Sequence, residues 1–213
     1  MNIKAISNLD ILKIYDNSDN KTYYGCDQEW YSSKWQRLSG CGPTVATNII
    51  FYLLHRKDVF SYENSFNGKT HWMSLMEEIW QYVTPTSRGI PNTKLFCEGM
   101  VKYSEAKEMN ILHSYFDVPK DKNYRRPFQE LIKFIETGLD KDIPVAFLNL
   151  CNGNEKNLDK WHWVTIVSLE YEEDGSSAFA NILDCGSILK VDLALWYDST
   201  KEGGGFVFVE AGV

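Results

Sequence analysis

Apolar side chains recur every three or four positions in the first two thirds of the chain, which is the spacing of amphipathic helices. The clearest case spans residues 43–57, where Pro43 suits the first turn and the basic residues 55–57 suit the C-terminal end. The same spacing predicts further helices at residues 71–83, 95–108 and 127–139. Residues 25–40 have no sustained period and are predicted to form a loop with a short helical turn.

From residue 143 onward the pattern changes to short apolar runs that are typical of strands. Residues 187–200 are ambiguous and could form a short helix. Helices followed by strands predict an α+β fold in a single domain, 1–213, with a helical part at about 41–140 and a sheet part at about 143–213. The helix at 43–57 is then the N-terminal central helix, packed with the others against a C-terminal antiparallel sheet. The predicted strands cover residues 143–150, 161–171, 178–185 and 205–211.

The composition is that of a folded globular protein and limits the kinds of partner. Of the 213 residues, 44% are hydrophobic and 24% are charged, and the formal net charge is −7. Binding to phosphates requires a basic face, so no nucleic-acid partner is expected. The apolar runs are far shorter than the roughly 20 residues of a membrane-spanning helix, and residues 1–20 lack a signal-peptide pattern. A cytoplasmic location without an integral membrane segment is therefore expected, and the oligomeric state stays open.

The cysteines are informative because they are unpaired in the sequence. There are five, an odd total, widely spaced and without a CxxC pair. This pattern argues against a disulfide framework or a zinc ribbon and fits a reducing compartment. The chain also lacks GxGxxG, P-loop and HExxH motifs, so no metal and no cofactor are expected.

Cys41 is the candidate nucleophile because it lies in SGCGPT, directly before the helix predicted at 43–57. Unpaired backbone N–H groups and the helix dipole stabilise a thiolate at such a position. The alternative is a small buried apolar residue, as most free cysteines are.

Two residues near the ends of the predicted strands complete a candidate triad. His162 begins the apolar run 162–171, and Asp184 follows 22 residues later at the end of the next run. A carboxylate in that place can hold the second ring nitrogen of a histidine base and fix its tautomer. The alternatives are a packed core imidazole and an ordinary aspartate at a strand end.

Three blocks, GCGPTVATNIIFYL, WHWVTIV and NILDCG, together resemble the Cys, His and Asp motifs of papain-like cysteine peptidases. The resemblance extends from about residue 25 to residue 185 and is nearest to the bacteriocin-leader (double-glycine) peptidases and related uncharacterised bacterial proteins. It implies that Cys41 is the nucleophile, His162 the base and Asp184 the residue that orients the base. Leader peptidases are attached to a membrane transporter, of which this sequence contains no segment, so leader processing is not carried over.

The same resemblance implies an oxyanion hole built from a glutamine side chain and the backbone N–H of the nucleophile. Gln28, in GCDQEW, is similar to the Gly-x-x-Gln-x-Trp block of the bacterial relatives and is the favoured candidate. Gln36 is the alternative, because its five-residue distance from Cys41 is nearer to the spacing of papain. The predicted substrate-binding residues are Gly40, Trp161 and Trp163.

These observations predict a cysteine peptidase or amide hydrolase that forms a thioester acyl-enzyme and acts on a peptide or protein. Two alternatives stay open: an acyltransferase or deamidase on the same fold, and a non-catalytic peptide-binding module.

Overall fold

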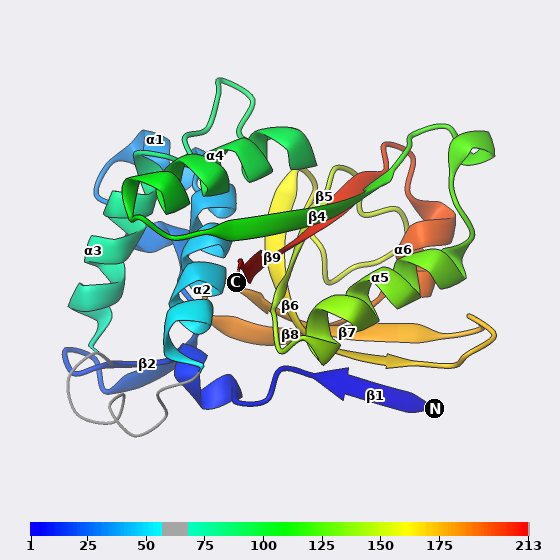
Figure 1. The fold of residues 1–213 in the computed structure, drawn as a ribbon, viewed down its shortest axis with the longest axis horizontal. Helices are drawn as coiled ribbons and strands as arrows, with labels where there is room; N and C mark the ends of the chain where they lie inside the picture. Colours follow the sequence, from blue (N-terminus) through cyan, green and yellow to red (C-terminus); the bar gives the residue numbers. More distant parts are fainter. Residues whose placement is uncertain (57–67, 213) are drawn as a thin grey trace.

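The computed structural model describes residues 1–56 and 68–212 and is built around one large antiparallel sheet (Figure 1). The sheet has seven strands, six of which follow one another in hydrogen-bonded order. The seventh, β1 (Asn2–Ala5), pairs with residues 168–171 of β6 (His162–Tyr171), beyond residues 162–166, which pair with β5 (Val145–Asn149). The order of the six is β4 (Ile111–Val118), β9 (Gly204–Ala211), β5 (Val145–Asn149), β6 (His162–Tyr171), β7 (Ala178–Asp184) and β8 (Ser187–Asp192).

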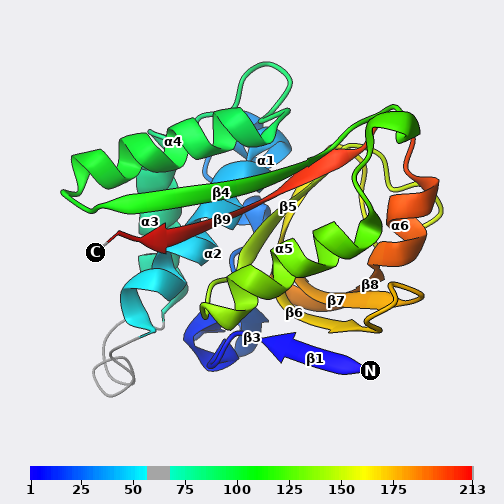
Figure 2. The same ribbon diagram turned by 45° about the vertical axis from the view of Figure 1, so that its right-hand side comes forward.

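Helices cover both faces of this sheet, so its central strands are buried on both sides (Figure 2). Alternate side chains of β5 enter two different cores: Ala146 and Leu148 pack with α2 (Cys41–His55) and α4 (Thr93–Ala106), whereas Phe147 packs with α5 (Phe128–Asp140) and α6 (Leu193–Ser199). The residues of β5 are therefore apolar at successive positions, which is the pattern of a strand covered on both faces. Helix α3 (Lys69–Trp80) packs against α2.

Helix α2 is the central helix of the fold and lies against β5, β6 and β9 on one side and α3 on another. All of its residues from Gly42 to Tyr52 are buried. The helix begins at Cys41, two residues before the proline that marks its start in the sequence. Lys57, with which the predicted helix ends, lies outside the described residues.

The region before α2 is more regular than its sequence pattern predicts. Strands β2 (Lys13–Asp16) and β3 (Lys21–Tyr24) form a hairpin, and the 3-10 helices η1 (Leu9–Leu12) and η2 (Gln28–Trp30) flank it. The helix α1 (Lys34–Ser39) follows, and it begins with a reciprocal capping box between Ser33 and Gln36. A six-residue helix is too short to reveal apolar periodicity, although its S-x-x-Q start is present in the sequence.

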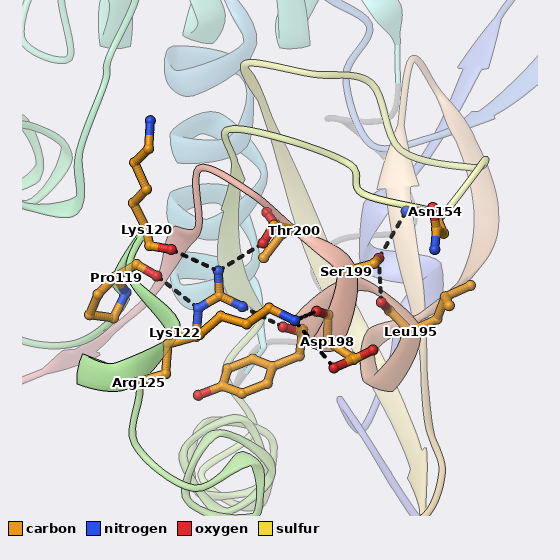
Figure 3. A network of polar contacts seen from close by, with 10 residues as sticks. Pro119, Lys120, Lys122, Arg125, Asn154, Leu195, Asp198, Ser199 and Thr200 are labelled. Atoms are coloured by element: carbon orange, nitrogen blue, oxygen red, sulfur yellow. Dashed lines mark hydrogen bonds and ion pairs between the residues drawn. The ribbon is translucent and has the colours of Figure 1, made fainter.

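The C-terminal end of α6 is tied to the connection before α5 by a network of polar contacts (Figure 3). Arg125, just after the 3-10 helix η4 (Lys122–Tyr124), donates hydrogen bonds to backbone carbonyl oxygens from two parts of the chain. Lys122 also contacts Asp198. Four carbonyl groups thus compensate one half-buried guanidinium, which gives this network a structural role. The four carbonyl partners of Arg125 belong to Pro119, Lys120, Tyr197 and Thr200.

The α+β class and the large antiparallel sheet agree with the sequence-based prediction. The predicted division into a helical part at 41–140 and a sheet part at 143–213 is too simple, because each part contains elements of the other kind. Strand β4 lies within the segment 41–140, β1 joins the sheet from the N-terminus, and α6 lies within the segment 143–213. Within the described residues, no helix combines the length and the apolar character that crossing a bilayer requires.

Candidate active site

Cys41 is the first residue of α2, where a tight join follows the end of α1. Gly40 makes this join, and a Cβ atom there would lie 2.5 Å from the carbonyl oxygen of Gln36 and 2.6 Å from the ring of Tyr31. Only glycine permits so close an approach. Cys41 is partly exposed, so its sulfur lies at a helix N-terminus that solvent can reach.

His162 begins β6 and Asp184 ends the neighbouring strand β7. The His162 Nε2 atom lies 2.7 Å from Oδ1 of Asp184, and each side chain is 12% exposed. Burial lowers the pKa of His162, but the hydrogen bond with Asp184 and the neighbouring Cys41 side chain outweigh it and raise the pKa to about 10. Burial raises the pKa of Asp184, yet the hydrogen bond and the charge of His162 hold it below its ordinary value. At neutral pH the pair is an imidazolium and a carboxylate.

The structure brings the three candidate triad residues to one small cavity. Cys41 from α2, His162 from β6 and Asp184 from β7 all line it. Because Asp184 occupies Nε2 of the imidazole, Nδ1 is the ring nitrogen that remains for the Cys41 side chain. A cationic imidazolium beside a cysteine stabilises the thiolate form that attacks carbonyl groups.

The two candidate glutamines lie in different surroundings. Gln28 lines the same cavity as Cys41, and its Nε2 donates to the carbonyl oxygen of Arg37 at 3.0 Å. The Oε1 atom of Gln28 is buried and has no hydrogen-bond partner among the described residues. Gln36 instead closes the capping box with Ser33 and donates Nε2 to Glu77 at 2.5 Å. Its amide is therefore committed to contacts away from the cavity.

Asn48, on the buried side of α2, connects the elements that surround the site. Its Oδ1 accepts the backbone N–H of Cys26 at 2.9 Å, and its Nδ2 donates to Oγ1 of Thr165 at 3.1 Å. The segment before Gln28, the helix and β6 are thereby joined through one side chain. Gly25 has φ +72° and leaves room for this amide, since a Cβ there would lie 2.9 Å from Asn48 Nδ2. No sequence motif identifies Asn48, because its partners are distant in the chain.

A cleft of about 480 Å³ opens beside Cys41. Two of the predicted substrate-binding residues line it: Trp161, which is 55% exposed, and Trp163, which is buried. The indole N–H of Trp163 donates to the carbonyl oxygen of Ile90 at 2.8 Å. Gly40 does not line the cleft.

The remaining walls of the cleft come from segments to which the sequence pattern assigns no role in binding. Trp35 and Leu38 of α1 are 49% and 70% exposed there, and the turn at 87–90 lies on another side. An exposed cluster of large apolar side chains beside a reactive group is typical of a ligand-binding surface. The turn-forming residues at 85–89 are visible in the sequence, but in sequence they indicate only the end of the preceding helix.

His162, Asp184 and the adjacent Cys185 are also the kinds of side chain that bind metals, and their ligand atoms lie within 4.8 Å of one another. Two ligands at ordinary zinc distances in a tetrahedral site are about 3.3 Å apart. The 2.7 Å between Nε2 and Oδ1 is much shorter. The geometry therefore fits a shared proton better than a shared cation.

Comparison with known proteins shows a similarity of fold and none of sequence. No protein-family model matches the chain, and no curated protein matches it in sequence. The α+β arrangement is similar to that of a solved structure with a papain-like fold. One similar structure is the crystal structure of UfSP from C. elegans, with a TM-score of 0.54 and 12% identity over 98% of this chain. The matched region is 34% of the UfSP chain, so this chain spans about a third of that protein's length.

Proposed function

We propose that the protein is a cysteine peptidase or amide hydrolase with Cys41 as its nucleophile. The observation that carries the proposal is that Cys41, at the start of a buried helix, lines the same cavity as a histidine that is hydrogen-bonded to a half-buried carboxylate at 2.7 Å. UfSP, whose fold this chain shares, is a cysteine protease, which supports the same reaction class.

The chemistry follows from the positions of the side chains. The Cys41 sulfur attacks the substrate carbonyl carbon and forms a C–S bond, which gives a tetrahedral intermediate, and the C–N bond breaks when this intermediate collapses. His162 gives its proton to the leaving nitrogen, and the acyl group remains on Cys41 as a thioester. His162 then takes a proton from water, which attacks the thioester and releases the acid and the Cys41 thiolate, so that the imidazolium–thiolate pair is restored. Asp184 keeps the imidazole in the required orientation throughout.

The oxyanion of each tetrahedral intermediate needs two donors. We assign these to the backbone N–H of Cys41 and to the Gln28 amide. One Nε2 hydrogen of Gln28 is used by the Arg37 carbonyl, which fixes the amide plane and leaves the second hydrogen for the substrate oxygen.

Alkylation tests the nucleophile directly. At pH 7, iodoacetamide should modify Cys41 faster than Cys97 or Cys151, as followed by intact mass and peptide mapping. Asp184→Asn should slow the reaction of Cys41, because the imidazolium loses its anionic partner. Equal rates at all three thiols would refute Cys41 as an activated nucleophile.

Turnover tests the reaction class. A library of internally quenched peptides should be cleaved by the wild-type protein and left intact by Cys41→Ala. If an added amine appears in the product in preference to water, the protein is an acyltransferase instead. If no amide substrate is consumed and no acyl-enzyme forms, the proposal of catalysis fails and a peptide-binding module remains.

A further inference from the structure

One basic side chain lies in the cleft beside Cys41. Of the residues that line the cleft in the described part of the chain, Arg88 is the single one of the Arg, Lys, Asp and Glu types. Arg88 is exposed, and only its backbone N–H has a partner among the described residues, the hydroxyl oxygen of Thr86 at 3.2 Å. Its guanidinium forms no hydrogen bond or ion pair within those residues and is free to bind an anion.

The turn that carries Arg88 is held in one conformation by its own hydrogen bonds. The backbone N–H of Thr86 donates to the carbonyl oxygen of Gly89 at 2.9 Å. The backbone N–H of Gly89 donates to the carbonyl oxygen of Thr86, also at 2.9 Å. The Thr86 hydroxyl also donates to the Gly89 carbonyl at 2.8 Å. Gly89 has φ +70°, which closes the turn in a conformation that glycine adopts without strain.

Ile90, directly after the turn, fixes it to both elements that carry the reactive residues. Its carbonyl oxygen accepts the indole N–H of Trp163, which is the neighbour of His162 on β6. Its side chain packs against Gly42, the neighbour of Cys41, where a Cβ atom would lie 2.6 Å from Ile90 Cδ1. The base of the Arg88 side chain is therefore held at a constant position relative to the nucleophile, and such preorganisation reduces the entropic cost of binding.

Resting on the peptidase activity proposed above, we infer that the cleft selects a peptide segment of mixed character. A large apolar side chain packs against the exposed Trp35 and Trp161, and an acidic side chain near the scissile bond pairs with Arg88. A guanidinium binds a carboxylate through two parallel hydrogen bonds, which gives direction as well as attraction.

The acid belongs to a side chain within the segment because Arg88 is exposed, so that a bound peptide can continue past it. The chain's net charge of −7 repels highly acidic peptides at long range. The preferred substrate therefore carries one acidic residue at this subsite and is not acidic throughout.

The test uses internally quenched decapeptides with a C-terminal amide and a central Phe, in which Glu or Gln is fixed in turn at each neighbouring position. At one position, the wild-type protein should cleave the Glu peptide with a kcat/KM on the order of tenfold above that of the Gln peptide, the ratio that about 1.4 kcal/mol produces. Arg88→Glu should abolish this preference and favour Lys. Lys102→Glu is the matched control, because Lys102 is exposed on α4 outside the cleft and the charge change is the same.

Binding to Cys41→Ala, measured by fluorescence polarisation of the labelled peptides, separates this inference from the peptidase proposal. Glu-dependent binding that Arg88→Glu removes, without turnover by the wild type, would support the subsite and refute the peptidase. Equal cleavage and equal binding of the Glu and Gln peptides would overturn the subsite and leave the peptidase intact. A gain seen only with a free C-terminal carboxylate would overturn the side-chain assignment.

Discussion

The amide of Asn48 joins α2 to β6 through a 3.1 Å hydrogen bond with the hydroxyl group of Thr165. The other end of the same amide accepts the N–H of Cys26. Both Asn48 and Thr165 are 1% exposed or less, so water cannot replace either contact. The distance between the helix that begins at Cys41 and the strand that begins at His162 thus depends on one buried side chain.

Asn48→Ala should lower the free energy of unfolding by about 2–4 kcal/mol, because it leaves two buried polar groups without partners. The alkylation rate of Cys41 should fall as well, since the helix and the strand would no longer be held in register. Urea denaturation and iodoacetamide kinetics measure the two effects. Asn154→Ala, at an exposed position, is the control and should change stability by less than about 0.5 kcal/mol. Unchanged stability in Asn48→Ala would contradict the bracing role.

The pH dependence should show that His162 is protonated well above neutrality. Its pKa is raised to about 10 from an unfolded value of about 6.5. The stabilisation from its charge is therefore fully present below about pH 6.5 and is lost as the pH rises through about 10. The contribution of Asp184 is also stabilising but has the opposite pH dependence, because the lowered pKa of Asp184 means that this contribution is lost only in acid.

Catalytic activity should accordingly decline at high pH, with an alkaline limb near pH 10. Asp184→Asn should move this limb toward lower pH by at least about one unit, since the neutral amide does not stabilise the imidazolium. Profiles of kcat/KM against pH for the two proteins measure the shift. Identical alkaline limbs in both would show that Asp184 does not control the protonation of His162.

The assignment of the oxyanion donor rests on a comparison of two glutamines. Gln28→Ala should reduce kcat by about 10²–10³-fold with little change in KM, which is the effect of removing one oxyanion donor. Gln36→Ala should retain kcat while losing about 1 kcal/mol of stability, because it breaks the capping box of α1. Steady-state kinetics measure kcat and KM of both variants, and thermal unfolding measures their stability. A loss of kcat confined to Gln36→Ala would assign the oxyanion donor to Gln36 instead of Gln28.

Cys151 and Cys185 should react with alkylating agents in an order that their exposure alone does not predict. Backbone N–H groups of Lys201 and Gly153 stabilise the thiolate of Cys151 and lower its pKa. Burial of the sulfur and the charge of Asp184 raise the pKa of Cys185, although this residue is the more exposed overall. In Cys41→Ala at pH 7, iodoacetamide should therefore modify Cys151 before Cys185. Peptide mapping over time measures both rates, and faster modification of Cys185 would disprove this order.

The central elements of the fold could be predicted because their patterns are local. The apolar spacing in α2 and the apolar-rich runs of β5 and β6 each extend over enough residues to be recognised. The sequence pattern does not identify strand β4, because His113 and other polar residues interrupt its apolar positions. Strand β1 has only four residues and acquires its conformation from β6, more than 160 residues later in the chain.

The residues of the candidate site likewise fall into those that a local sequence pattern reveals and those that it does not. Cys41, His162 and Asp184 are each marked by a short motif, so the sequence was sufficient to propose them. The roles of Asn48 and Arg88 depend on contacts between distant segments, such as the 73-residue separation between Trp163 and Ile90. No local pattern encodes such contacts.

The position of β9 in the sheet has a consequence for how the chain reaches its native state. This strand lies between β4 and β5 and is the hydrogen-bonded neighbour of both. Among the strands that the structure describes, β9 is the single hydrogen-bonded neighbour of β4, so we expect the backbone groups of β4 to lack a strand partner until residues 204–211 have left the ribosome. Such pairing between remote segments gives a high contact order and slow folding. Assembly of the sheet is therefore expected to follow synthesis of β9, with the nascent chain exposed to aggregation and to chaperones until then.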